Sequence, residues 1–121
     1  MLIMLVDDSR AMRMIQKRIL NQIGYDSIVE ASNGVEALTL VKSESPDLIL
    51  LDWNMPEMNG LEFLESFREN DKSTPVIMVT TEAEKKQVLT AAKAGANNYV
   101  IKPFEPDTLK NKIEETLAKM K

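Results

Sequence analysis

Short runs of consecutive apolar residues alternate along the chain with longer amphipathic stretches. The runs Leu2–Val6 and Leu48–Leu51 contain no polar residue, and three further runs are similar or shorter. Uninterrupted apolar runs of this length are typical of strands that are buried on both faces of a parallel sheet. The expected strands are Leu2–Val6, Ser27–Val29, Leu48–Leu51, Val76–Val79 and Tyr99–Ile101.

Between these strands, apolar residues recur at every third or fourth position, which is the spacing of one face of an α-helix. Gly24 and Gly95 follow the first and the fourth of these stretches, where glycine commonly ends a helix. The sequence therefore predicts five helices. The expected inward-facing residues are Met12, Ile15, Ile19 and Ile23, then Val35, Leu38 and Val41, then Leu61, Leu64 and Phe67, then Val88, Leu89 and Ala92, and finally Leu109, Ile113, Leu117 and Met120.

Five strand–helix pairs predict an α/β protein of the (βα)5 type, with one domain over residues 1–121. Right-handed crossovers leave few topologies for a parallel sheet of this size. We expect a doubly wound sheet with the flavodoxin-like strand order 2-1-3-4-5. In that order a ligand crevice opens at the carboxyl ends of the first and third strands.

Composition narrows the chemistry, because the chain contains no cysteine and no histidine. Their absence excludes disulfide scaffolds, thiol redox chemistry and zinc sites built from these residues. It also excludes nucleophiles that depend on a histidine base. A bound metal would need oxygen ligands, and a nucleophile would be Ser, Thr, Lys, Tyr, Asp or Glu.

The charge distribution argues against two classes of partner. The net charge is −4 and no segment forms a polybasic run, so the sequence does not predict nucleic-acid binding. No apolar stretch approaches the roughly 20 residues that cross a bilayer, and the first residues lack the features of a secretory signal. We expect a cytoplasmic protein that does not associate with a membrane.

Acidic residues follow the two strands that flank the expected crevice. Asp7 and Asp8 come directly after the first strand, and Asp52 comes directly after the third. Thr80 follows the fourth strand and Lys102 follows the fifth. Because the carboxyl ends of parallel strands meet at one edge of the sheet, we expect these five side chains to converge.

Such a cluster requires a compensating positive charge. Two carboxylates ~4 Å apart repel by about 4 kcal/mol at an effective dielectric constant of 20. Lys102 supplies one positive charge, and oxygen ligands of this kind suit Mg²⁺, which leaves positions open for phosphate oxygens. A carboxylate beside Mg²⁺, a lysine and a hydroxyl has the components of a phosphoryl-transfer site. Single acids at strand ends more often form turns or helix caps, but the five together point to a site.

These residues also carry a family resemblance. Asp7-Asp8, Asp52-Trp53-Asn54-Met55-Pro56, Thr80 and Lys102-Pro103-Phe104 resemble the motifs of response-regulator receiver domains. Met58-Asn59-Gly60 and Ala94-Gly95-Ala96 with Tyr99 make the chain most similar to the stand-alone chemotaxis receivers, which have no output domain. The similarity extends from the first strand to the last helix.

The resemblance implies a role for each matching residue. Asp52 would accept the phosphoryl group, and Asp8 and Asp52 would bind Mg²⁺ with the backbone carbonyl of Asn54. Asp7 would act through a metal-bound water, and Lys102 would pair with the phosphoryl group. Thr80 would hydrogen-bond to that group, and Tyr99 would switch between outward and inward positions as Thr80 moves. The Lys102–Pro103 peptide bond is expected to be cis.

The resemblance also implies partners. A histidine kinase would donate the phosphoryl group, and a phosphatase would be a further partner. The flagellar motor switch protein would bind a face made by the fourth helix, the fifth strand and the fifth helix, at Val88, Tyr99 and Lys112. Asn54 and Glu82 would tune the lifetime of the phosphoryl group. Ser9 and Thr81 depart from the residues of the best-known chemotaxis receiver, and the protein is expected to be a monomer.

Three alternatives remain open at this stage. A receiver outside chemotaxis, such as a phosphorelay intermediate, would share every motif above. An Mg²⁺-dependent phosphatase with an aspartate nucleophile would need a different spacing after the first strand and a cap domain. A flavin carrier of the same topology would place Ser, Thr and Gly after the first strand, where Asp7 and Asp8 would repel a phosphate.

Overall fold

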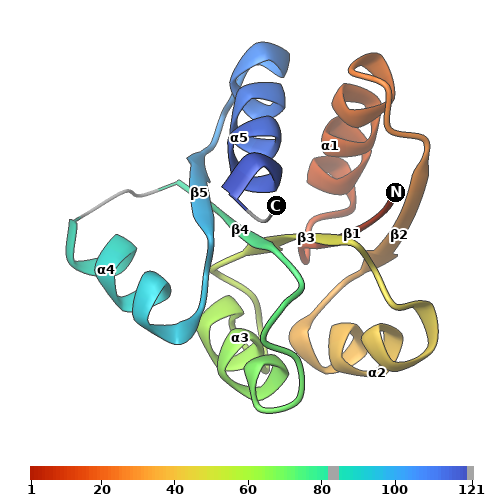
Figure 1. The fold of residues 1–121 in the computed structure, drawn as a ribbon. Coiled ribbons are helices and arrows are strands. Elements are labelled where there is room, and N and C mark those ends of the chain that lie inside the picture. Colours follow the sequence, from red (N-terminus) through yellow and green to blue (C-terminus); the bar gives the residue numbers. More distant parts are fainter. Residues whose placement is uncertain (82–84, 120–121) are drawn as a thin grey trace.

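Five strands and five helices alternate along the chain in the computed structural model, which describes residues 1–81 and 85–119. Each strand is followed by a helix that returns the chain to the amino-terminal edge of the sheet (Figure 1). The strands are β1 (Leu2–Val6), β2 (Ser27–Ala31), β3 (Leu48–Asp52), β4 (Val76–Thr80) and β5 (Asn98–Ile101). The helices are α1 (Arg10–Gln22), α2 (Gly34–Glu44), α3 (Gly60–Arg68), α4 (Lys85–Ala94) and α5 (Pro106–Lys119).

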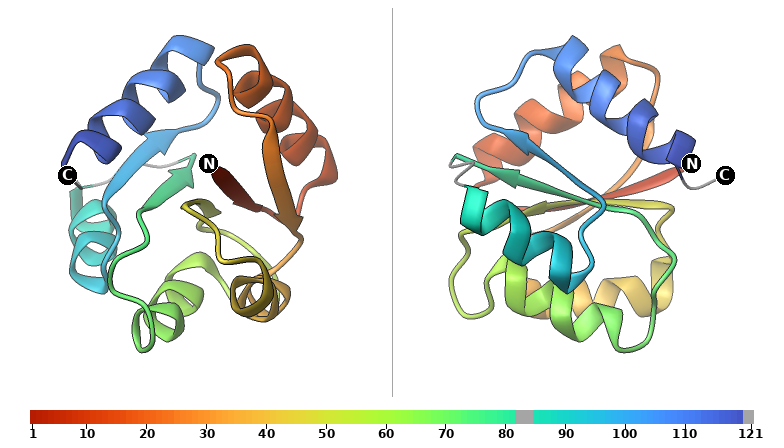
Figure 2. Two further views of the ribbon diagram at one scale, coloured as in Figure 1. Left: turned by 45° about the vertical axis from the view of Figure 1, so that its right-hand side comes forward. Right: turned by 60° about the vertical axis from the view of Figure 1, so that its left-hand side comes forward.

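The strands form one parallel sheet in the order β2-β1-β3-β4-β5. Helices α1 and α5 cover one face of this sheet, and α2, α3 and α4 cover the other (Figures 1 and 2). The flavodoxin-like (βα)5 prediction is confirmed. In this topology a crevice forms between neighbouring strands whose following connections run in opposite directions, here from β1 toward β2 and from β3 toward β4.

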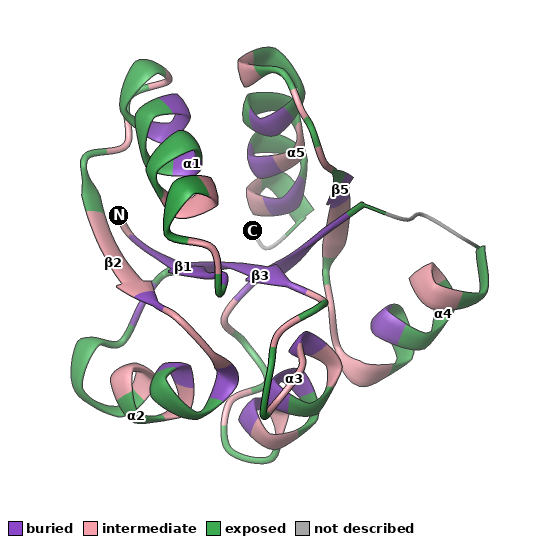
Figure 3. Ribbon diagram, turned by 180° about the vertical axis from the view of Figure 1, so that it is seen from behind, coloured by how far each residue is buried: buried purple, intermediate pink, exposed green. Residues whose placement is uncertain are grey.

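The three central strands carry the core. Every residue of β3 and β4 is buried, as are four of the five residues of β1. Figure 3 shows these strands as a continuous buried layer between the two sets of helices. Edge strand β2 is buried only at Ala31. The unbroken apolar runs of the sequence are therefore explained by helices on both faces of the central strands.

Four strands, β2, β3, β4 and β5, are longer than the sequence predicted, and the extensions of β3 and β4 bear on the site. Strands β3 and β4 each continue one residue beyond their apolar run, so that Asp52 and Thr80 still lie within the hydrogen-bonded ladder. A residue inside the ladder has its backbone position fixed by the neighbouring strand. The sheet therefore fixes the backbone from which the side chains of Asp52 and Thr80 project.

The predicted inward faces of three helices need correction. Ile15 of α1 is 48% exposed, and Val35 of α2 and Leu89 of α4 are each about half exposed. In α1 the buried residues are Gln16, Ile19 and Leu20, so the inward face is rotated from the predicted one. The apolar pattern failed there because a polar residue, Gln16, occupies the buried stripe. Met120 lies outside the described residues.

Helix ends agree with the sequence at the two predicted glycines. Gly24 and Gly95 adopt the left-handed φ values of +102° and +110° that end α1 and α4. A capping box that the sequence pattern did not reveal begins α3. Asn59 Oδ1 accepts a hydrogen bond from Glu62 N, and Glu62 Oε1 accepts one from Asn59 N.

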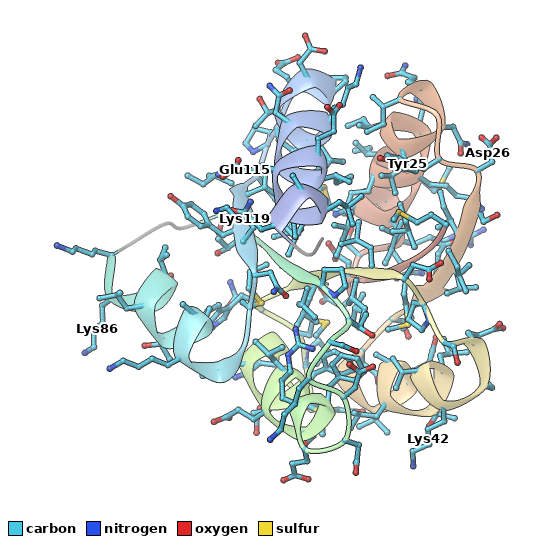
Figure 4. All side chains as sticks on the ribbon, in the orientation of Figure 1. Tyr25, Asp26, Lys42, Lys86, Glu115 and Lys119 are labelled. Atoms are coloured by element: carbon cyan, nitrogen blue, oxygen red, sulfur yellow. The ribbon has the colours of Figure 1, made fainter. Side chains whose placement is uncertain are left out.

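Charged side chains lie mostly on the outer surface of the helices (Figure 4). Glu115 and Lys119 lie one turn apart on α5, with Lys119 Nζ 3.9 Å from Glu115 Oε1. Lys42 of α2 and Lys86 of α4 project away from the sheet. Within the described chain, no helix combines the length and apolar character that a membrane span requires.

Candidate functional site

Three carboxylates meet at the carboxyl edge of the sheet. Strands β1 and β3 are parallel neighbours with Val6 opposite Leu51, so the residues that follow them leave the sheet at the same level. Asp7, Asp8 and Asp52 each place a carboxylate oxygen within 4.8 Å of the other two. Asp7 and Asp52 are buried, whereas Asp8 is exposed. The convergence predicted from the sequence is confirmed for these three residues.

Lys102 completes the cluster from β5. Its backbone N–H donates to Thr80 O at 2.7 Å, which continues the β4–β5 ladder beyond the last paired residues. Its ammonium lies 3.2 Å from Asp7 Oδ2 and 3.1 Å from Asp52 Oδ1. The Lys102–Pro103 peptide bond is cis, as expected. The lysine therefore bridges the two buried carboxylates.

Burial and mutual repulsion set the electrostatics of the cluster. Burial raises the pKa of the Asp52 carboxyl and the charge of Asp7 adds to the rise, while the hydrogen bond and charge of Lys102 oppose it. Burial acts to lower the pKa of Lys102, but its contacts with Asp52 and Asp7 outweigh that effect and raise it. The site thus holds excess negative charge that one ammonium does not neutralise.

The loop after β3 fixes the main chain of Asp52. Gly60 N donates to Trp53 O at 2.9 Å, and Trp53 N donates to Val79 O at 3.3 Å. A Cβ atom on Gly60 would collide with the carbonyl oxygen of Asp52, so only glycine fits there. Asn54 is exposed in this loop, two residues beyond Asp52.

Thr80 and Tyr99 border a small cavity beside the cluster. Thr80 is buried at the end of β4, and Tyr99 is half buried on β5. Together with Trp53, Gln87 and Val88 they line a space of about 10 Å³. Thr80 and Tyr99 therefore border the same space, and a movement of Thr80 would change the room beside the Tyr99 ring.

The expected partner face is centred on Tyr99. Val88 of α4 and Tyr99 line one surface hollow of about 210 Å³. Tyr99 and Lys112 of α5 line a second hollow of about 280 Å³. Lys112 Nζ lies 4.7 Å from the centre of the Tyr99 ring, within the range of a cation–π interaction. The structure therefore brings these three residues together.

Two residues that hold Asp7 were missed by sequence reasoning. Arg13 Nη1 donates to Asp7 O at 2.6 Å, and Gln16 Nε2 donates to Asp7 Oδ2 at 3.4 Å. One feature of the sequence could have indicated the role of Gln16. This residue lies one turn before the apolar pair Ile19–Leu20, so it falls on the helix face that packs against the sheet. Glu82, the second residue expected to tune the site, lies outside the described residues.

The donor set fits a hard divalent cation. The three converging side chains offer only carboxylate oxygens, which are the ligands that Mg²⁺ and Ca²⁺ prefer. Asp8 is exposed and gives access from solvent, while Asp7 and Asp52 lie in a buried floor. A cation there would offset the negative charge that Lys102 leaves. The cluster can therefore hold a metal ion.

Comparison with known proteins identifies the family. Residues 3–114 match the family model of the response regulator receiver domain. The chain therefore belongs to the response regulator receiver domain family. Like other receivers, it is a phospho-acceptor signalling protein rather than a classical enzyme.

Within that family the chain is similar to chemotaxis proteins. It is 50% identical over 121 residues to the chemotaxis protein CheY homolog of Campylobacter jejuni, covering 98% of this chain and 93% of that protein. It is 47% identical to chemotaxis protein CheY1 of Helicobacter pylori, with 98% of each chain covered. The solved structure of Vibrio cholerae CheY4 superposes with a TM-score of 0.88 at 34% identity, covering 94% of this chain and 96% of that one. The chain is thus a CheY-like receiver.

Proposed function

We propose that Asp52 is the phosphoryl acceptor of a chemotaxis response regulator. The observation that carries this proposal is the position of Lys102, whose ammonium lies between Asp52 and Asp7. Asp52 is also the one member of the acidic cluster that lies inside the sheet ladder. A carboxylate that is rigidly held beside an ammonium is well placed to attack an incoming phosphoryl group.

The transfer forms one bond and breaks one bond. A carboxylate oxygen of Asp52 attacks phosphorus, and the bond from phosphorus to the donor nitrogen or acyl oxygen breaks. The electron pair of the broken bond stays with the donor. Lys102, already 3.1 Å from Asp52 Oδ1, pairs with the negative charge that arrives with the phosphoryl group.

The metal of this site is proposed to be Mg²⁺. Asp8 and Asp52 would hold it with the backbone carbonyl of Asn54, and Asp7 would contribute through a bound water. When bound, Mg²⁺ neutralises charge on the carboxylates and on the phosphoryl oxygens. The excess negative charge of the cluster supports this assignment, because it needs a compensating cation.

Thr80 and Tyr99 are proposed to convert phosphorylation into a change of shape. Thr80 would hydrogen-bond to the phosphoryl group and move away from the cavity that it lines with Tyr99. Tyr99 would then turn inward and leave Lys112, which now lies over its ring. The shared lining of the cavity supports this order of events, since a movement of Thr80 would open space beside the ring. Glu82 and Asn54 remain proposed to set the lifetime of the phosphoryl group.

The face made by α4, β5 and α5 is proposed to bind the target. A CheY-like receiver has a histidine kinase as its general partner. We assign the flagellar motor switch protein as the target that contacts Val88, Tyr99 and Lys112, and a phosphatase as a further partner. The two hollows that Tyr99 lines support this face, because turning the ring would reshape both of them.

The acceptor assignment is tested with acetyl phosphate and Mg²⁺. Trp53 adjoins Asp52 and is the single tryptophan, so its fluorescence should report first the metal and then phosphorylation. Asp52→Asn should lose the response to acetyl phosphate and incorporate no phosphate. Asp26→Asn, on the exposed turn between α1 and β2, is the matched control and should behave as wild type. Phosphate incorporation by Asp52→Asn at the wild-type level would refute the assignment.

The target is tested by affinity capture with and without beryllofluoride, which mimics the phosphoryl group. Selective capture of the flagellar switch protein by the treated form supports the chemotaxis assignment. Capture of a phosphotransfer protein in its place would favour a phosphorelay intermediate and overturn that assignment. A Val88→Asp variant should lose the capture while still accepting phosphate, because Val88 lies on the proposed face and outside the acidic cluster.

A further inference from the structure

Asp7 has more hydrogen-bond partners than a residue in a strand-end turn requires. Its side chain is 1% exposed, and Oδ1 accepts a bond from Ser9 N at 2.9 Å. Oδ2 accepts from Lys102 Nζ at 3.2 Å and from Gln16 Nε2 at 3.4 Å. Donors therefore hold both oxygens, and the orientation of this carboxylate is set by its surroundings.

Gln16 is an unusual residue at its position in α1. It is 1% exposed and lies on the helix face that also buries Ile19 and Leu20 against the sheet. A primary amide buried among apolar side chains destabilises a fold unless its polar atoms are hydrogen-bonded. An apolar residue would fill this position at lower cost. The hydrogen bond to Asp7 offsets part of the cost of burying this amide.

A second side chain of the same helix holds the main chain of Asp7. Arg13, one turn before Gln16, donates from Nη1 to Asp7 O at 2.6 Å. Its Nε lies 3.1 Å from Glu30 Oε1 on β2, which anchors the guanidinium from the other side. With its carbonyl held by Arg13, Asp7 cannot follow a movement of Lys102 by shifting its backbone. The remaining freedom is rotation of the carboxylate, which Gln16 restrains.

We propose that Gln16 is a positioning residue that fixes the Asp7 carboxylate and thereby sets the affinity of the acidic cluster for Mg²⁺. This inference rests on the proposed metal site. Without Gln16, Oδ2 of Asp7 keeps only the Lys102 partner, and the bond from Ser9 N to Oδ1 alone opposes rotation of the carboxylate toward that ammonium. Lys102 would then be drawn from Asp52, and the cluster would lose the arrangement that receives the cation. Partners of a direct metal ligand typically change metal affinity by about 10-fold to 100-fold, and Gln16, which acts through Asp7 and its bound water, is expected at the lower end of that range.

The test measures Mg²⁺ affinity rather than phosphorylation. Gln16→Met has similar length and no donor, and its Mg²⁺ dissociation constant, followed through Trp53 fluorescence, should rise by about tenfold. Gln22→Met makes the same change at an exposed position of α1 and should leave the constant unchanged. Ile19→Val loosens the same helix face without touching Asp7 and should lower stability only.

A double-mutant cycle separates positioning from general loosening. In an Asp7→Asn background, Gln16→Met should cause no further loss of Mg²⁺ affinity, since the carboxylate it restrains is gone. If Gln16→Met does not fold, the side-chain amide signals of Gln16 in the wild type provide the answer. These signals should show slowed hydrogen exchange and should shift when Mg²⁺ is added.

The possible outcomes are distinct. A wild-type protein that binds no Mg²⁺ would overturn the proposed metal site itself. If the wild type binds and Gln16→Met binds equally well, only the positioning role is overturned. An Ile19→Val variant that weakens binding as strongly as Gln16→Met would also overturn it, as would Gln16 amide signals that ignore Mg²⁺.

Discussion

Lys102 and Asp7 are separated by 95 positions in the sequence, yet their side chains lie 3.2 Å apart. The contact joins the end of β5 to the end of β1, across the two strands that lie between them in the sheet. Asp52, at the end of one of those strands, is the third member of the contact. The acidic cluster therefore combines residues from the first strand and from the end of the last strand. A change of charge at one of them alters the electrostatic environment of the others.

Asp52→Asn should stabilise the fold in the absence of metal. The pKa of Asp52 is raised, so its ionised form opposes folding, and stability falls as the pH rises through that pKa. Removal of the charge should increase the free energy of unfolding at neutral pH by about 1 kcal/mol. Urea unfolding with a chelator present measures the effect. Added Mg²⁺ should stabilise the wild type and not the variant, and a less stable variant would contradict the prediction.

Lys102→Met should have the opposite effect on stability. It leaves the two buried carboxylates without the ammonium that bridges them, which should lower the free energy of unfolding by about 3 kcal/mol. Excess Mg²⁺ should restore most of the loss, because the cation replaces the missing charge. Unfolding curves with chelator and with Mg²⁺ test both statements. A loss that Mg²⁺ does not reduce would show that the lysine acts mainly through packing.

Lys102→Ala should separate phosphorylation from its consequence. Asp52 is intact in this variant, and it should still accept phosphate from acetyl phosphate. The phosphoryl group would lack its ammonium partner, so Tyr99 should keep its unphosphorylated environment. Phosphate incorporation and NMR signals of the Tyr99 ring measure the two steps separately. A normal ring response would refute the role given to Lys102.

Gly60→Ala should disturb the site through the backbone. Its Cβ would collide with the carbonyl oxygen of Asp52, which should lower the free energy of unfolding by about 1–3 kcal/mol and weaken Mg²⁺ binding. Gly24→Ala is the control, because Gly24 has a φ of +102° but nothing lies within 4 Å of the position that an added Cβ would take. It should lose about 1 kcal/mol of stability and bind Mg²⁺ normally. Equal effects on Mg²⁺ binding would contradict the argument.

Acid stability should depend on Asp71, far from the site. Burial acts to raise the pKa of this carboxyl, but hydrogen bonds from Thr74 and Ser73 and the charge of Arg68 together lower it below 3.8. The stability it contributes is therefore present above pH 3.8 and is lost as the pH falls through the lowered pKa. Asp71→Asn should lose about 1–2 kcal/mol at neutral pH.

The pH series provides the control for that variant. The difference in unfolding free energy between wild type and Asp71→Asn should shrink as the solution is acidified below the usual carboxyl pKa. Urea midpoints across the series measure it. A difference that stays constant with pH would mean that the charge of Asp71 contributes nothing.

Sequence reasoning was reliable where local pattern and buried environment agree. The runs of β1, β3 and β4 predicted strands because a strand covered on both faces must be apolar along its whole length. It was least reliable for helix faces, as Ile15 and Leu89 show, because several rotations of a short helix satisfy the same apolar spacing. The orientation in the fold depends on what the sheet and neighbouring strands present.

The sequence by itself determined the fold class, the strand order and the acidic residues that converge, because strand ends in a parallel sheet fall at known places. It could not determine how those residues are held. The salt bridge from Lys102 to Asp7 and the hydrogen bond from Gln16 to the same carboxylate join residues that no local pattern connects. Such contacts depend on the spacing between separate elements, and only packing in three dimensions sets that spacing.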